Sequence, residues 1–224
     1  MFQVRKISAF TLSALCAVIA AVIICVCAIS CSGGQISYKS QYYFVCYRIT
    51  DNAISASSLS STVSSYGGAG YILNYDKYYY VTVSCYYKQR DAETVCASLK
   101  KRDLECSVLK IETNKYKLKS SSKNNRQLFL GNFNTLNSLS LLVYDCANKL
   151  DTGEFSQNKA KEIIYSVQNS VKGLLKSNES NCFTNGLNNI YAECEDKQRG
   201  FLMSKDMRYL QIAIIDLIIN VKTF

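Results

Sequence analysis

Apolar residues dominate two stretches of the chain, and each stretch runs into a segment with helical spacing. The two runs are YYFVCYRI (42–49) and YYYVTVSCY (78–86), and both are rich in the β-branched and aromatic residues that are typical of strands. One helical face after the first run carries Ala53, Ala56, Leu59 or Ser60, and Val63, and one face after the second carries Ala92, Val95, Cys96 and Leu99. The pattern predicts two successive strand-helix units.

Turn signals complete these units. Thr50 or Asp51 can cap the first helix, and GGAG (67–70) ends it. YILNY (71–75) forms a hairpin with the second run, and LECSVLKIE (104–112) supplies a fourth strand. The order β-α-β-β-α-β, which ferredoxin-like and RNP-like folds share, predicts an α+β fold. Its four-stranded antiparallel sheet has strands 1 and 3 at the centre and two helices on one face.

A sheet with helices on one face leaves its other face open. Strand alternation assigns to the helix-covered face Phe44, Cys46, Val81 and Val83. It assigns to the open face Tyr43, Val45, Tyr47, Tyr80, Thr82 and Ser84. A tyrosine ring can stack on a sugar while its hydroxyl bonds a sugar hydroxyl, so these six residues form a candidate glycan-binding site. The alternative is that tyrosine is present only as a good strand former.

The composition changes from residue 119 onward. Residues 119–127 are charged and rich in Ser and Asn, which predicts a linker between an α+β domain at 41–118 and a helical domain at 128–224. Apolar stripes at helical spacing run at 133–150, 160–175 and 207–221, with Ser156 and Ser204 as N-caps. These stripes predict a small C-terminal all-α bundle.

The N-terminus contains the longest apolar segment. Residues 7–30 carry no charge, and a helix of this length crosses the hydrocarbon core of a bilayer. Arg5 and Lys6 precede the segment and no basic residue follows it closely, so residues 1–6 are expected in the cytoplasm and the rest of the chain outside. We therefore expect a single-pass protein of the cell membrane, with a transmembrane helix at 7–30 and a short tether at 31–40.

The stretch from residue 41 to about 112 resembles a SPOR (sporulation-related repeat) domain. Each half of that domain has an aromatic-flanked V-x-V strand, a small turn, and a helix opened by an acidic residue and alanine. The matching elements here are Phe44 to Cys46 followed by Asp51, Asn52 and Ala53, and Val81 to Val83 followed by Arg90, Asp91 and Ala92. The family usually has a glutamine between the first pair of valines and a glycine after them, where this chain has Val45 and Tyr47.

The resemblance implies a function in the bacterial cell envelope. SPOR proteins are commonly single-pass envelope proteins whose domain, outside the membrane, binds peptidoglycan glycan strands stripped of stem peptides, often at the division septum. The resemblance thus implies a non-catalytic peptidoglycan-binding protein of cell division or sporulation that contacts glycan through its open face. The alternative is a membrane-anchored protein-interaction scaffold of the divisome or sporulation machinery that does not bind glycan.

The composition also indicates which kinds of activity and ligand site are not expected. The chain has no histidine, no Gly-rich phosphate loop and no G-x-S-x-G motif, so we expect neither enzymatic activity nor a cofactor. Without histidine or a C-x-x-C pair, no metal site is expected. The net charge of +9 fits anionic surroundings as well as ordinary solvation. An exported domain that lacks the glycine of the RNP third-strand motif is not expected to bind nucleic acid.

Seven of the eleven cysteines lie beyond the apolar segment and Cys31. Seven is an odd number, so at least one of them is unpaired or pairs between chains. Two alternatives follow for this part of the chain: buried free thiols, or a disulfide such as Cys182 to Cys194.

Overall fold

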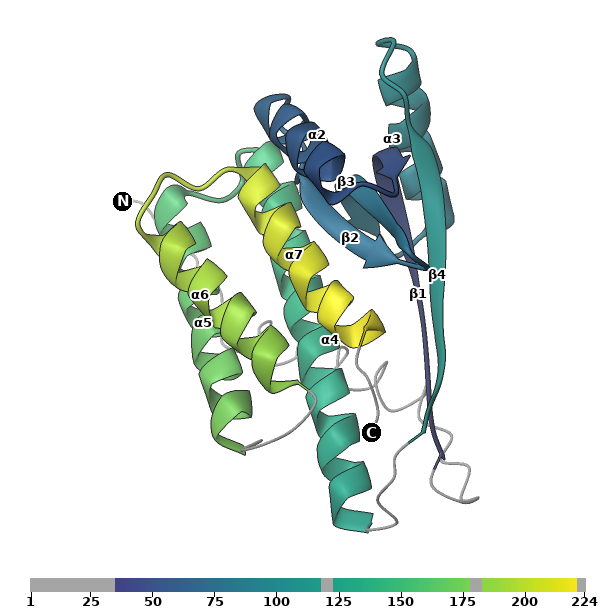
Figure 1. Cartoon of the computed structure of the whole chain (residues 1–224). Coiled ribbons are helices and arrows are strands. Elements are labelled where there is room, and N and C mark those ends of the chain that lie inside the picture. The colour runs from purple at the N-terminus through teal and green to yellow at the C-terminus, as the bar shows by residue number, and fades with distance from the viewer. Residues whose placement is uncertain (1–34, 118–122, 178–182, 221–224) are drawn as a thin grey trace, which may run out of the picture.

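The computed structural model describes residues 35–117, 123–177 and 183–220. A four-stranded sheet lies between two pairs of helices, and a third pair forms an outer layer (Figure 1). The helices are α2 (Ala53–Ser65), α3 (Gln89–Lys100), α4 (Lys123–Asp151), α5 (Gln157–Ser177), α6 (Thr184–Gln198) and α7 (Ser204–Ile219). The predicted transmembrane helix at 7–30 lies outside the described residues. Within them, no helix combines the length and hydropathy needed to cross a membrane.

The sheet has the predicted topology. Its strands are β1 (Gln35–Thr50), β2 (Tyr71–Tyr75), β3 (Tyr78–Tyr86) and β4 (Ser107–Lys117). They lie in the order β2-β3-β1-β4 with antiparallel pairing throughout, which confirms that strands 1 and 3 occupy the centre. Asp76 and Lys77 have positive φ angles in the tight turn of the β2–β3 hairpin, as such two-residue turns require.

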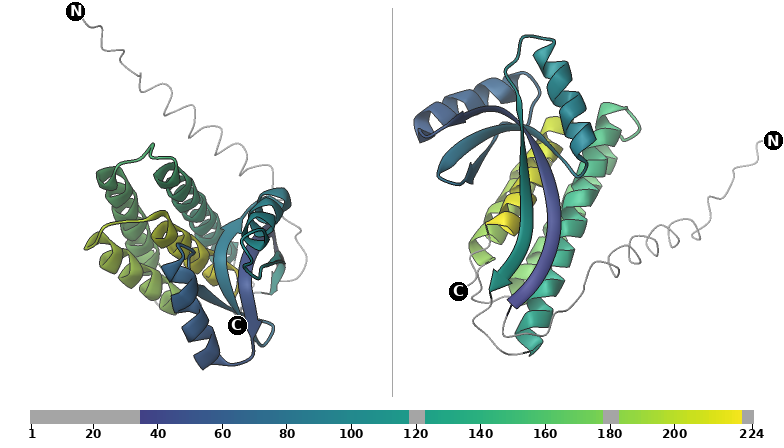
Figure 2. Two further views of the ribbon diagram at one scale, coloured as in Figure 1. Left: turned by 90° about the horizontal axis from the view of Figure 1, so that it is seen from above. Right: turned by 90° about the vertical axis from the view of Figure 1, so that its right-hand side faces the viewer.

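Some element boundaries differ from the predicted ones. Strand β1 begins at Gln35, so residues 35–40, expected as tether, belong to the sheet. Helix α4 begins at Lys123, inside the stretch 119–127 that was expected as linker. Strands β1 and β4 are also longer than predicted, and they run on past α3 as a two-stranded ribbon (Figure 2).

Three helix starts test the predicted caps. The cap of α2 is Asn52, whose Oδ1 accepts hydrogen bonds from the backbone N–H groups of Ile54 (2.8 Å) and Ser55 (3.2 Å), and not Thr50 or Asp51. Ser156 caps α5 as predicted, because its Oγ accepts a bond from the Lys159 N–H (3.3 Å). Ser204 is instead the first residue of α7. The preceding Met203 stands in the cap position, and its N–H donates to Asp206 Oδ2 (2.8 Å).

The C-terminal helices do not form a bundle with a separate core. The largest buried cluster joins them to the sheet. Its members include Phe44, Leu73 and Ile111 from the sheet, Phe133 and Leu136 from α4, and Leu210 and Ile214 from α7. The sheet and these helices therefore fold around one shared apolar core.

Helices cover both faces of the sheet, so the prediction of an open face was wrong. On one face, α2 packs Ala56 and Val63 against Val81, and α3 packs Ala92 and Cys96 against the strands. On the other face lie α4 and α7 (Figures 1 and 2). The helices that cover this face are separated from strand β3 by more than thirty residues of sequence, so local patterns did not reveal them.

The face assignment of β1 was reversed. Phe44 and Cys46 lie in the cluster with α4 and α7, whereas Tyr43 and Val45 pack against α3. The run YYFVCY is apolar in both phases of the alternation, because both sides of this strand are buried, and such a pattern cannot tell one face from the other. Val81 and Val83 of β3 do lie on the face of α2 and α3, as predicted.

The cysteines are paired differently from the expected example. A disulfide joins Cys96 of α3 to Cys106, just before β4. In the proposed pair Cys182–Cys194, Cys182 lies outside the described residues and Cys194 is a buried free thiol. Buried free thiols are also found at Cys46, Cys85 and Cys146, which confirms that alternative for these positions.

Candidate functional site

The six predicted glycan-binding residues are not brought together on one surface. Tyr43 and Val45 are buried under α3, and Tyr47 packs against the cluster of Ala56 and Val63 from α2 and Val81 from β3. Tyr80 packs on the opposite face, against the core shared with the C-terminal helices. Thr82 and Ser84 are both buried: Thr82 donates to the backbone carbonyl of Tyr71 (2.8 Å), and the Ser84 hydroxyl has no hydrogen-bond partner among the residues that the structure describes.

Other tyrosines bond the sheet face that was expected to be open to the chain's own helices. The Tyr42 hydroxyl donates to Asn137 Oδ1 of α4 (3.4 Å), and the Tyr87 hydroxyl donates to Ser140 Oγ, also of α4 (2.8 Å). On the other side, the Tyr71 hydroxyl donates to Asp216 Oδ2 of α7 (2.7 Å). We call this contact between the sheet and α4/α7 the seam.

Burial sets the chemistry of the seam tyrosines. It raises the pKa of Tyr42, Tyr71 and Tyr87 above the ordinary value for a phenol, so all three remain neutral hydrogen-bond donors. Gln211 of α7 adds a bond from its Nε2 to the backbone carbonyl of Cys85 (3.3 Å). The three tyrosine hydroxyls and the Gln211 Nε2 group are thus committed as donors to acceptors within the chain.

The apolar part of the seam is fully dehydrated. Phe44 and Leu73 have no exposed surface, and Ile111 has almost none. Aromatic rings add to the packing, since the centroids of Tyr38 on β1 and Phe133 on α4 are 4.8 Å apart. Separating the helices from the sheet would expose a core rather than a polar binding face, which makes the seam a structural contact and not a lid.

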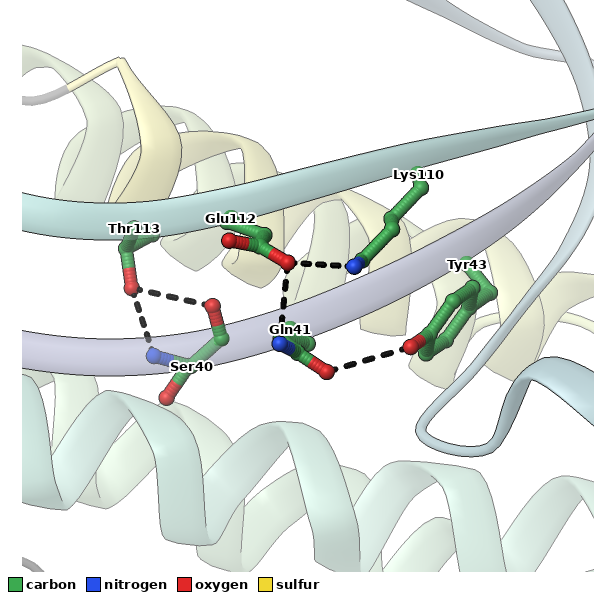
Figure 3. A network of polar contacts seen from close by, with 6 residues as sticks. All are labelled: Ser40, Gln41, Tyr43, Lys110, Glu112 and Thr113. Carbon is green, nitrogen blue, oxygen red and sulfur yellow. Dashed lines mark hydrogen bonds and ion pairs between the residues drawn. The ribbon is translucent and has the colours of Figure 1, made fainter.

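A polar surface that the sequence reading missed lies on the outer side of the β1–β4 ribbon, beyond α3 (Figure 3). Gln41 Nε2 donates to Glu112 Oε1 across the strands (2.9 Å), and the Tyr43 hydroxyl donates to Gln41 Oε1 (3.1 Å). Lys110 forms an ion pair with Glu112. We call Gln41, Lys110 and Glu112 the outer polar row.

The outer polar row is solvent-accessible, with 47% of the Lys110 side chain and 32% of the Glu112 side chain exposed. Hydrogen bonding between these two groups raises the pKa of Lys110 and lowers that of Glu112. The row had a signal in the sequence: Lys110 and Glu112 alternate with the apolar Leu109 and Ile111, the pattern of a strand with one wet face. The polar row can hydrogen-bond a polar ligand.

Catalytic machinery is not evident at these surfaces. Among the residues that the structure describes, no group of three or more Cys, Asp or Glu side chains is placed to hold a metal ion. The chain has no histidine to serve as a general base near neutral pH.

Comparison with known proteins gives one structural match. No protein-family model matches the chain, and no curated protein matches its sequence. Among solved structures, the chain is similar to the peptidoglycan-binding domain of the B. subtilis cell wall lytic enzyme CwlC, whose structure was determined in solution. The two are 22% identical, the match covers 37% of this chain and 98% of that one, and the TM-score is 0.29. A similarity at this level does not decide the function of this chain.

Proposed function

We propose that the protein is a non-catalytic interaction scaffold of the bacterial cell envelope, acting in division or sporulation through protein partners rather than through a glycan-binding sheet face. The observation that carries this proposal is the seam. A four-stranded sheet with helices on one side leaves its other face free for a ligand. In this protein α4 and α7 cover that other face. The SPOR-like unit then serves as the platform on which the C-terminal helices fold.

Two further features support a place at the outer surface of the membrane. With the predicted span ending at residue 30 and β1 beginning at Gln35, the intervening chain reaches roughly 15 Å at most. A unit held this close to the bilayer is suited to membrane-proximal partners. The Cys96–Cys106 disulfide fits an oxidising compartment outside the cytoplasm.

Peptidoglycan binding through the outer polar row is the second candidate function. The observation that favours it is the solvent-accessible amide, carboxylate and ammonium group on the β1–β4 ribbon, which can bond sugar hydroxyl and acetamido groups. In this reading the SPOR-like unit binds glycan strands, but at Gln41, Lys110 and Glu112 instead of at the tyrosine face.

A sedimentation experiment separates the two functions. The full chain, in a non-ionic detergent, is mixed with purified sacculi before and after an amidase has removed the stem peptides. We expect no retention above that of an unrelated protein of equal charge, in moderate salt that screens non-specific attraction. In membranes from which the wall has been digested, the chain should remain in a complex larger than itself, because its partners are proteins.

Matched variants make this experiment decisive. The test variant replaces Gln41 and Glu112 with alanine. The control variant replaces Gln89 and Glu93, an exposed Gln–Glu pair of the same chemistry on α3. Retention on stripped sacculi that the test variant loses and the control variant keeps would overturn the scaffold proposal in favour of glycan binding at the outer polar row.

A further inference from the structure

A groove between α6 and α7, with Tyr71 of β2 in its lining, adjoins the seam, with which it has Tyr71 and Asp216 in common. Its volume is about 420 Å³, which is within the range of small-molecule sites. Apolar residues form part of its wall: Ile190 of α6, and Ala213 and Leu217 of α7. Gly186 and Ala192 of α6 also line it, and its polar residues are Tyr71, Asn189, Glu193, Tyr209, Asp216 and Asn220.

The charge of the groove is opposite to that of the chain. Among the described residues of its lining, the only Asp, Glu, Lys or Arg residues are Glu193 and Asp216, and both are acidic. The chain as a whole carries +9. A cationic ligand is therefore electrostatically matched to the groove, and an anionic one is not.

Asp216 is the group best placed to hold a cation. Its carboxylate accepts hydrogen bonds from two neutral donors, the Tyr71 hydroxyl (2.7 Å) and Asn220 Nδ2. Within the described part of the chain Asp216 forms no ion pair, whereas the Glu193 carboxylate lies 3.7 Å from the Lys197 ammonium group. A carboxylate has about four acceptor positions, so Asp216 retains capacity for further donors.

Aromatic rings next to the carboxylates suit the same class of ligand. Tyr71 and Tyr209 pack edge to face with their centroids 5.0 Å apart. The Lys197 ammonium already lies 4.8 Å from the Tyr209 ring centroid, so this ring is in use as a cation partner within the chain. The groove combines acidic groups, an aromatic wall and a short apolar surface.

We propose that this groove binds the ammonium end of a small alkylamine, with the ammonium group on Asp216 and the alkyl stem along Ala213 and Leu217. An ammonium group has three donors, and the side-chain carbonyls of Asn189 and Asn220, which also line the groove, can accept those that Asp216 does not. The apolar stem then covers the wall that water would otherwise wet. This inference does not depend on the scaffold proposal.

Calorimetry on the full chain in a non-ionic detergent tests it. The probes are 1,5-diaminopentane, the neutral 1,5-pentanediol of the same length, and Nα-acetyl-lysinamide. The diamine should bind saturably and at least about tenfold more tightly than the diol, because a charge-assisted hydrogen bond is roughly twice as strong as a neutral one. Comparison with the lysinamide tells whether a free amine or a lysine side chain is the better source of the ammonium group.

Variants locate the binding. Asp216→Asn should weaken diamine binding about tenfold or more, and Glu193→Gln should weaken it less. Glu162→Gln removes an exposed carboxylate on α5 and should have no effect. In Asp216→Asn the amide oxygen can still accept from Asn220 Nδ2 and the amide nitrogen can donate to the Tyr71 hydroxyl oxygen, and burial, which raises the pKa of the Asp216 carboxyl, already disfavours a charge there. The melting temperature of Asp216→Asn should therefore stay close to that of the parent. Equal binding of diamine and diol, or equal effects of Asp216→Asn and Glu162→Gln, would overturn the proposal.

Discussion

Replacing Phe44 with alanine should lower the free energy of unfolding by about 3 to 5 kcal/mol, the usual cost of removing a fully buried phenylalanine side chain. Phe44 has no exposed surface and belongs to the cluster that joins the sheet to α4 and α7. The loss combines the transfer of the ring to water with the cavity that it leaves. Urea unfolding of the full chain in detergent, followed by circular dichroism, measures it.

A second phenylalanine provides the control. Phe201, before α7, is 78% exposed, so Phe201→Ala should change the free energy of unfolding by no more than about 0.5 kcal/mol. If Phe44→Ala costs as little as Phe201→Ala, the face of β1 that carries Phe44 is not packed against the helices. The proposal that the sheet is a platform for the helices would then lose its basis.

Removing the Cys96–Cys106 disulfide should cost about 3 kcal/mol of stability, the value expected from loop closure for a link between residues 10 apart. The variant replaces both cysteines with serine, and its stability is compared with that of the parent chain by urea unfolding. Addition of a reductant to the parent should produce the same loss. It should not change the variant further, because the other described cysteines are free thiols.

The oxidation state of the same disulfide in cells tests whether the domain lies outside the cytoplasm. In cells, Cys96 and Cys106 should resist alkylation after denaturation unless a reductant is added first, as expected for an oxidising environment outside the cytoplasm. Alkylation of both residues without reductant would contradict the extracytoplasmic location proposed for the domain.

The strand and helix order of residues 35–117 could be predicted because it rests on local signals. Turns with glycine, alternating strands and one amphipathic helix determine the β-α-β-β-α-β order and hence the strand order. The phase of β1 could not be predicted from these signals, because a strand buried on both faces has no polar side to mark it. That single ambiguity placed Phe44 and Tyr43 on the wrong faces.

The covering of the second sheet face depends on long-range contacts, yet α7 carried a sign of it. Consecutive residues Leu210, Gln211 and Ile212 of α7 are all buried, as are Ile214 and Ile215, so this helix has neighbours on most of its sides. A surface helix in a small bundle has one apolar stripe and a polar remainder. A helix that is apolar around much of its circumference lies between two layers, and here these are the sheet and the other C-terminal helices.

The candidate sites could not be predicted from the sequence for related reasons. The tyrosine-rich runs stand out in the sequence, but the hydroxyl groups of Tyr42, Tyr87 and Tyr71 bond to Asn137, Ser140 and Asp216, which come from helices distant in sequence. The groove between α6 and α7 draws its carboxylates from two helices and a ring from β2. No local spacing connects such residues, so only the tertiary structure brings them together.

Thiol labelling of the native full chain tests the seam most directly, because Cys46 and Cys85 are free thiols inside it. Burial raises the pKa of the Cys46 thiol to about 12 and raises that of Cys85 as well, so both should be unreactive at neutral pH for two reasons, lack of access and lack of thiolate. With a maleimide and peptide mass spectrometry, we expect both residues to be labelled only after unfolding in urea. Labelling of Cys46 and Cys85 in the native chain at rates near those of the unfolded chain would show that this sheet face is bare.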